Sequence, residues 1–144
     1  MTSPPPVPLR PLRLGPGEDP RRALEALAAD GLARFVVAGI GSLEGARLRL
    51  AAADREAVLE GPFEIVSLSG SVTADGAHLH MAVADAQGRV TGGHVVHGNV
   101  VRTTVELLLA ELPGWSLGRE LDTRTGYEEL VVRGPAAGGA GGAD

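Results

Sequence analysis

The stretch from Gly61 to Val96 alternates strand-like segments with glycine turns, and it limits the possible folds more than any other part of the chain. Asp75-Gly76 is a strong two-residue hairpin signal, and Gln87-Gly88 marks a second turn. We expect strands at residues 61–73, 77–85 and 89–96. Because strands joined by tight turns pair antiparallel, the stretch predicts an antiparallel sheet. Alternation places Phe63, Ile65, Ser67 and Ser69 on one face of the first strand.

One helix is predicted near the N-terminus. Asp19 can accept hydrogen bonds from the first helical N–H groups, and Pro20 suits the first helical position. Leu24 and Leu27 follow at helical spacing, and Gly31 is a natural stop.

The remaining strands are expected at residues 12–14, 35–40, 46–51, 100–112 and 127–133. The apolar run at 35–40 is typical of a buried strand, and the β-branched start of 100–112 favours strand over helix. Aromatic residues make up only 3% of the chain and hydrophobic residues 44%, so the core consists of small and branched side chains that suit packed strands. We expect a single α+β domain at residues 9–133, mainly antiparallel sheet with one early α-helix. Disordered segments are expected at residues 1–8, which are proline-rich, and 134–144, which are rich in glycine and alanine.

Charge and composition exclude several classes of function. The net charge is −5, which disfavours binding to phosphate backbones. The chain has no cysteine, so disulfides and thiolate chemistry are impossible. The N-terminus carries no apolar signal-peptide region, and no apolar run approaches the ~18 residues of a membrane helix. We therefore expect a cytoplasmic protein.

Three of the four histidines form the best candidate for a functional site. His78 and His80 share one face of a strand, with Cα atoms roughly 7 Å apart. The following hairpin can bring His94 to the same place, and the glycines before it allow close backbone approach. Three imidazoles suit Zn²⁺, or another divalent transition metal, and leave a fourth position open to water or a small ligand. The alternative is that these are ordinary surface or pore-lining histidines. His97 is expected on the other strand face.

Two carboxylates inside apolar strands, Glu64 and Glu106, are weaker candidates. Such a residue either pairs with an arginine, here Arg49 or Arg102, or acts as a general acid or base. We favour ion pairs for both acids. If one acts in catalysis, Glu106 is the better candidate, while Arg49 and Glu64 are candidate ligand-binding residues.

The same motifs resemble the plants-and-prokaryotes-conserved (PPC) domain, in its stand-alone prokaryotic type. The matching segments, in order, are Leu14-Gly-Pro-Gly-Glu-Asp19, Gly41-Ser-Leu43, Gly61-Pro-Phe-Glu-Ile-Val-Ser-Leu-Ser-Gly70, Gly76-Ala-His-Leu-His80, Gly92-Gly-His-Val95, Gly98-Asn-Val-Val101 and Thr103-Thr-Val-Glu106. They cover nearly all of the expected folded part.

The resemblance implies a mixed α/β fold with a dominant antiparallel sheet and a homotrimer. It also implies that His78, His80 and His94 ligate a metal, and a similar fold in acetolactate decarboxylase holds zinc through three histidines. Plant members bind AT-rich DNA through a preceding AT-hook, whose Arg-Gly-Arg-Pro core is absent here. The leading hypothesis is a three-histidine zinc site that binds or acts on a small ligand. The sequence leaves open whether the protein is an enzyme. The alternatives are a DNA-binding or transcription-associated protein, whose contact residues we cannot name, and a trimeric protein-interaction module.

Overall fold

A computed structural model describes residues 6–135 of the chain. Its elements, in chain order, are β1 (Leu9–Leu14), α1 (Pro20–Leu27), the 3₁₀ turn η1 (Ala28–Asp30), β2 (Arg34–Arg49), β3 (Glu56–Thr73), β4 (Gly76–Ala84), β5 (Val90–Val95), β6 (Val101–Glu111), β7 (Ser116–Asp122) and β8 (Tyr127–Arg133). The expected α+β class is confirmed, with a mainly antiparallel sheet and one α-helix in this range. The expected tails at 1–8 and 134–144 lie largely outside the described residues.

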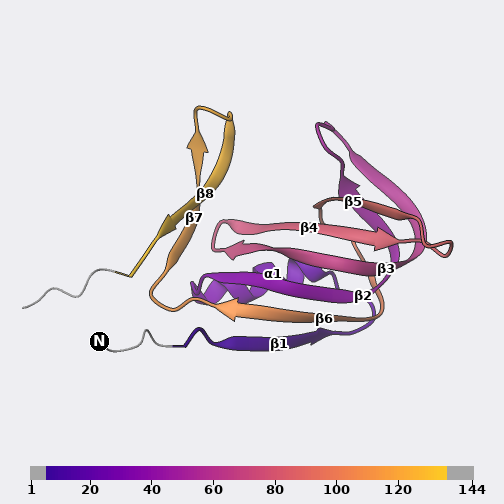
Figure 1. Cartoon of the computed structure of the whole chain (residues 1–144), viewed down its shortest axis with the longest axis horizontal. Coiled ribbons are helices and arrows are strands. Elements are labelled where there is room, and N and C mark those ends of the chain that lie inside the picture. The colour runs from indigo at the N-terminus through magenta and orange to yellow at the C-terminus, as the bar shows by residue number, and fades with distance from the viewer. Residues whose placement is uncertain (1–5, 136–144) are drawn as a thin grey trace, which may run out of the picture.

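Six strands form one sheet in the order β1-β6-β2-β3-β4-β5 (Figure 1). The end of β2 also pairs with β5, through Leu48 opposite Val95 and Arg49 opposite His94. The sheet therefore curls, so that β5 lies between β4 and the far end of β2. Strands β7 and β8 form a separate hairpin, which stands beside the turn that joins β3 to β4 (Figure 1). Of these two, the sequence predicted only β8.

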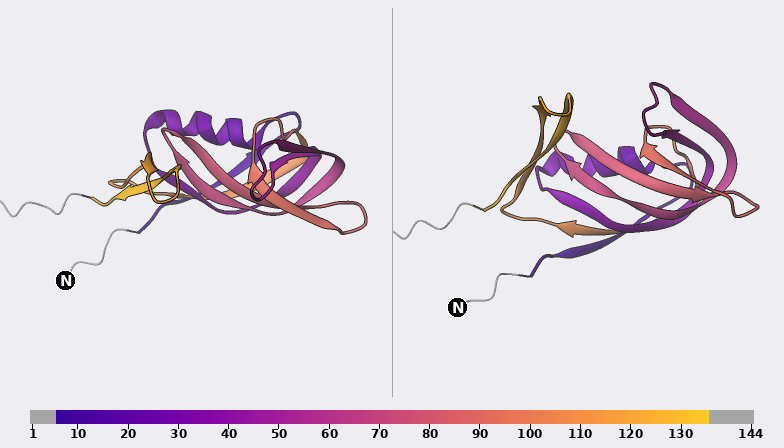
Figure 2. Two further views of the ribbon diagram at one scale, coloured as in Figure 1. Left: turned by 90° about the horizontal axis from the view of Figure 1, so that it is seen from above. Right: turned by 45° about the horizontal axis from the view of Figure 1, so that its top comes forward.

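The helix begins as predicted. The Asp19 side chain accepts hydrogen bonds from the backbone N–H groups of Arg21, at 3.0 Å, and Arg22, at 3.3 Å, and Pro20 occupies the first position. Helix α1 lies against one face of the curved sheet (Figure 2). Its fully buried Leu24 joins a core of valine and leucine side chains from the sheet, so this face carries the hydrophobic core.

A buried arginine connects the helical segment to the sheet. Arg34 is 1% exposed, and its guanidinium binds Asp30 at 2.5 Å and Glu111 at 2.8 Å. Because Asp30 belongs to η1 and Glu111 to β6, this one side chain fixes the end of the helical segment against the sheet.

Two expectations about strand faces are wrong. Phe63 and Ile65 are buried, but Ser67 and Ser69 are exposed and Leu68 is buried instead. The register of β3 against β4 shifts between Ile65 and Ser67, and this extra residue exchanges the two faces.

The run at 35–40 is also not fully buried. Val36 is buried, whereas Val37 and Ile40 are 55% and 54% exposed on the face that α1 leaves uncovered. Within residues 6–135 no helix is long and apolar enough to cross a membrane.

Candidate metal centre

The three histidines predicted from spacing converge on the sheet face opposite α1. In β4, Leu79 and Met81 point into the core, so His78 and His80 point outward. His94 of β5 lies directly opposite His80 in the strand register. The hairpin between β4 and β5 thus brings all three rings to one place.

Their geometry is close to that of a metal site. One ring nitrogen from each histidine lies within 4.8 Å of the corresponding atoms of the other two. The ring centroids are 5.0 Å apart for His78–His80 and His78–His94, and 5.7 Å for His80–His94. Tetrahedral coordination at ~2.0–2.1 Å separates ligand nitrogens by about 3.3 Å, so each pair has to close by at most about 1.5 Å. Side-chain rotations can supply this movement.

Glycine lets the backbone of β5 approach β2 closely next to His94. A Cβ at Gly93 would lie only 2.8 Å from the carbonyl oxygen of Arg49. A larger residue would push β5, and His94 with it, away from the other two histidines.

The site favours the neutral, metal-binding form of imidazole. Burial, then the charge of Arg49 and the neighbouring His78, lowers the pKa of His94 to about 4. Burial, then Arg119 and His80, also lowers the pKa of His78. Both rings are therefore neutral near pH 7, with a lone pair that can coordinate a metal. The donor set and its electrostatics fit a divalent transition metal.

Comparison with known proteins places the chain in a family. The model of the Plants and Prokaryotes Conserved domain, abbreviated PCC or PPC, matches residues 6–113. The chain belongs to the PPC domain family. The bifunctional protein GlmU of Synechococcus sp. (strain JA-2-3B'a(2-13)) is 45% identical over 130 residues, which are 89% of this chain. The match covers only 20% of that relative, so the chain spans about a fifth of its length.

Solved structures of similar proteins share the fold. A hypothetical protein from Salmonella is 37% identical with a TM-score of 0.85, over 90% of this chain and 95% of that one. A metal-containing protein from Archaeoglobus fulgidus is 27% identical with a TM-score of 0.73, over 88% of this chain and 95% of that one.

The other residues singled out from the sequence lie in different places in this PPC domain. Arg49 is next to the triad, opposite His94. His97 lies outside it, with its Nε2 atom 2.7 Å from Glu25 of α1. Glu64 pairs with Ala84, at the end of β4 away from His80.

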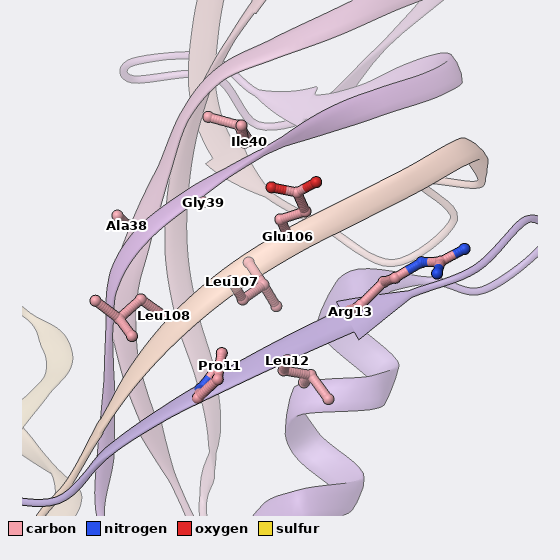
Figure 3. Close-up of a pocket in the computed structure, with 9 residues that line it drawn as sticks. All are labelled: Pro11, Leu12, Arg13, Ala38, Gly39, Ile40, Glu106, Leu107 and Leu108. Atoms are coloured by element: carbon pink, nitrogen blue, oxygen red, sulfur yellow. The ribbon is translucent and has the colours of Figure 1, made fainter.

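Glu106 lies on β6, between Ile40 of β2 and Arg13 of β1, and lines a pocket of about 600 Å³ (Figure 3). The structure brings neither Glu64 nor Glu106 to the triad. Within residues 6–135 neither acid forms an ion pair with Arg49 or Arg102, so that expectation is wrong.

Two charged residues beside the triad were not predicted from the sequence. Arg119 of β7 and Glu129 of β8 line a pocket of about 330 Å³ together with His78 and His80. The available signal for β7 was weak: Leu117 and Leu121 stand at an even spacing, as on one face of a strand, before the turn that ends at Gly126.

Proposed function

We propose that this PPC domain binds a divalent transition metal, best Zn²⁺, through His78, His80 and His94. The observation that carries the proposal is the convergence of three imidazole nitrogens within 4.8 Å on two paired strands. The lowered pKa values of His78 and His94 support it, because a protonated imidazole cannot coordinate a metal. The metal-containing Archaeoglobus protein with the same fold agrees with it.

The bound metal would bind a small ligand at its open coordination position. A metal with three protein ligands supplies an open coordination position and Lewis acidity to whatever enters the site. Arg49, opposite His94, adds positive charge at the edge of the site, which favours an anionic ligand.

The metal content of the purified protein tests the proposal. The protein is purified without a nickel column, and its metals are measured by mass spectrometry. We expect about one equivalent of zinc or a similar metal per chain, and its loss in His80→Ala. His97→Ala is the matched control, because His97 lies outside the triad, and it should keep the metal. Absence of metal from the wild type, or equal retention by His80→Ala, would contradict the proposal.

We also propose that the chain forms a homotrimer through the sheet face that α1 does not cover. Val37, Ile40 and Val66 are each more than half exposed on this face, beside the apolar pocket between β1, β2 and β6. Such a cluster of exposed apolar side chains is typical of an association surface. Light scattering should give three times the mass of one chain for the wild type and a smaller mass for Ile40→Asp. A monomeric wild type would overturn this part of the proposal.

DNA binding is the alternative function suggested by the plant members of the family. The net charge of −5 argues against it, because binding to duplex DNA depends on neutralising its phosphates. We expect no mobility shift of an AT-rich duplex at low salt. A shift that weakens steeply with added salt would favour the alternative.

A further inference from the structure

The hairpin of β7 and β8 is anchored beside the histidine triad by a single arginine. The backbone N–H of Arg119 donates to the Asp75 carboxylate at 2.9 Å, and its Nη2 donates to the hydroxyl of Ser71 at 2.8 Å. Asp75 and Ser71 belong to the β3–β4 hairpin, and Ser71 lies directly opposite His78. The guanidinium is therefore held at a fixed place next to a metal ligand.

The space between the hairpin and the triad is a pocket of about 330 Å³. His78, His80 and Ser71 line it from the sheet, and Arg119 and Glu129 line it from the hairpin. Phe35 and Leu130 add apolar surface. A pocket of this size and mixture fits a small organic molecule with one charged end and a short carbon skeleton.

Arg119 has hydrogen-bonding capacity left for a ligand. A guanidinium carries five N–H donors, and among residues 6–135 the guanidinium of Arg119 donates one hydrogen bond, to the neutral hydroxyl of Ser71. Within residues 6–135 no carboxylate lies within 4.0 Å of its guanidinium nitrogens, although Glu129 lines the same pocket. The Glu129 carboxylate instead accepts a hydrogen bond from Thr125 at 3.0 Å. A half-buried arginine without an anionic partner favours an anionic ligand, and carboxylates match its planar donors best.

Arg119 and Glu129 give the hairpin side of the pocket one cation and one anion. With one carboxylate of a ligand bound at Arg119, a second anionic group on this side would be repelled by the Glu129 carboxylate. The hairpin side of the pocket therefore suits a ligand with a single carboxylate.

We propose that Arg119 is the ligand-binding residue that holds a small monocarboxylate in this pocket, next to the coordination position that the three histidines leave open. The proposal rests on the metal site described under Proposed function and assigns the class of its ligand. The proposal also gives the β7–β8 hairpin a role in recognition. This hairpin lies beyond residues 6–113, which match the family model.

Cobalt-substituted protein provides the test, because the visible spectrum of Co²⁺ reports on entry into its coordination shell. Full-length wild type is loaded with Co²⁺ and titrated with acetate, propionate, lactate and pyruvate, and separately with inorganic phosphate. We expect saturable spectral changes with at least one monocarboxylate, and weaker binding of phosphate. In Arg119→Gln the monocarboxylate should bind at least about tenfold more weakly, as for the loss of hydrogen bonds to a charged group.

Three further variants separate recognition from general charge and from folding. Arg124→Gln removes the same charge from the same hairpin but lies on the exposed turn, paired with Asp122, so it should bind like wild type. Arg119→Lys should give intermediate affinity, because it keeps the charge but loses the planar pair of donors. Glu129→Gln should strengthen phosphate binding relative to the monocarboxylate.

The outcomes distinguish this proposal from the metal site itself. If Arg119→Gln keeps one metal per chain and loses monocarboxylate affinity, the proposal stands. If Arg119→Gln keeps the metal and binds monocarboxylates like wild type, the ligand assignment is wrong and the metal site remains. The same conclusion follows if wild type prefers phosphate or binds none of the four acids. If wild type takes up no Co²⁺ or Zn²⁺, the metal site is wrong and the ligand assignment falls with it.

Discussion

Replacing Gly70 with alanine should disturb both the stability of the sheet and the metal site. Gly70 lies in β3 opposite Leu79, between the partners of His78 and His80. Its φ angle of +149° belongs to a region that side chains rarely adopt. A Cβ there would lie 2.0 Å from the carbonyl oxygen of His78.

The cost has two parts. An unfavourable backbone conformation at a residue other than glycine costs about 1–3 kcal/mol. The steric clash forces β3 and β4 apart by more than 1 Å, because a Cβ and an oxygen normally stay about 3.2 Å or more apart. Loss of one or two ladder hydrogen bonds adds about 1 kcal/mol each. We therefore expect the free energy of unfolding of Gly70→Ala to fall by about 2–5 kcal/mol.

Urea denaturation followed by circular dichroism measures this change, and Gly88→Ala is the matched control. Gly88 has a φ angle of +78° in an exposed turn, and a Cβ there would meet nothing within 4 Å. The free energy of unfolding of the control should fall by only about 1–2 kcal/mol, because the left-handed backbone conformation is the one unfavourable change. Where Gly70→Ala still folds, its metal affinity should fall about tenfold or more because His78 and His80 are displaced. Equal stability of the two variants would refute the close approach of β3 to β4.

Three further predictions concern the anchoring of the helical segment. Arg34→Met should lower the free energy of unfolding by about 3 kcal/mol, since it leaves Glu111 without its partner; a loss below about 1 kcal/mol in urea denaturation would contradict this. Hydrogen bonds from Arg34 lower the pKa of Asp30 to about 2, so its contribution to stability is complete above pH 3.8 and disappears as the pH falls towards 2. Between pH 5 and pH 2.5 the free energy of unfolding should therefore fall less for Asp30→Asn than for wild type. Asp19→Ala should cost about 1–2 kcal/mol in thermal or urea unfolding, because it removes the helix cap and the 2.7 Å hydrogen bond from the N–H of Gly98.

The histidine triad could be predicted because local patterns determine it. Alternation along a strand sets which side chains share a face, and a short turn sets which residue of the next strand lies opposite. His78, His80 and His94 all belong to one such hairpin.

Features that depend on distant contacts could not be predicted in this way. Arg49 reaches His94 only because the long strand β2 curls round to pair with β5, and nothing local to either segment encodes that pairing. The extra residue near Val66 in β3 exchanges the faces of the strand. Its local mark, the adjacent apolar pair Ile65-Val66 followed by Leu68, is overlooked when strict alternation is assumed along the whole strand. Arg119 lies in a strand with few apolar residues, and its place in the pocket follows from hydrogen bonds to Ser71 and Asp75, more than 40 positions earlier.

X-ray absorption spectroscopy of the zinc-loaded protein tests the central claim most directly. We predict three imidazole nitrogens at ~2.0–2.1 Å and one further light donor that exchanges when a small anion is added. The His97→Ala variant should give the same spectrum, and His80→Ala should lose one imidazole or the metal altogether. Fewer than three imidazoles in the wild type, or an unchanged spectrum for His80→Ala, would contradict the three-histidine site.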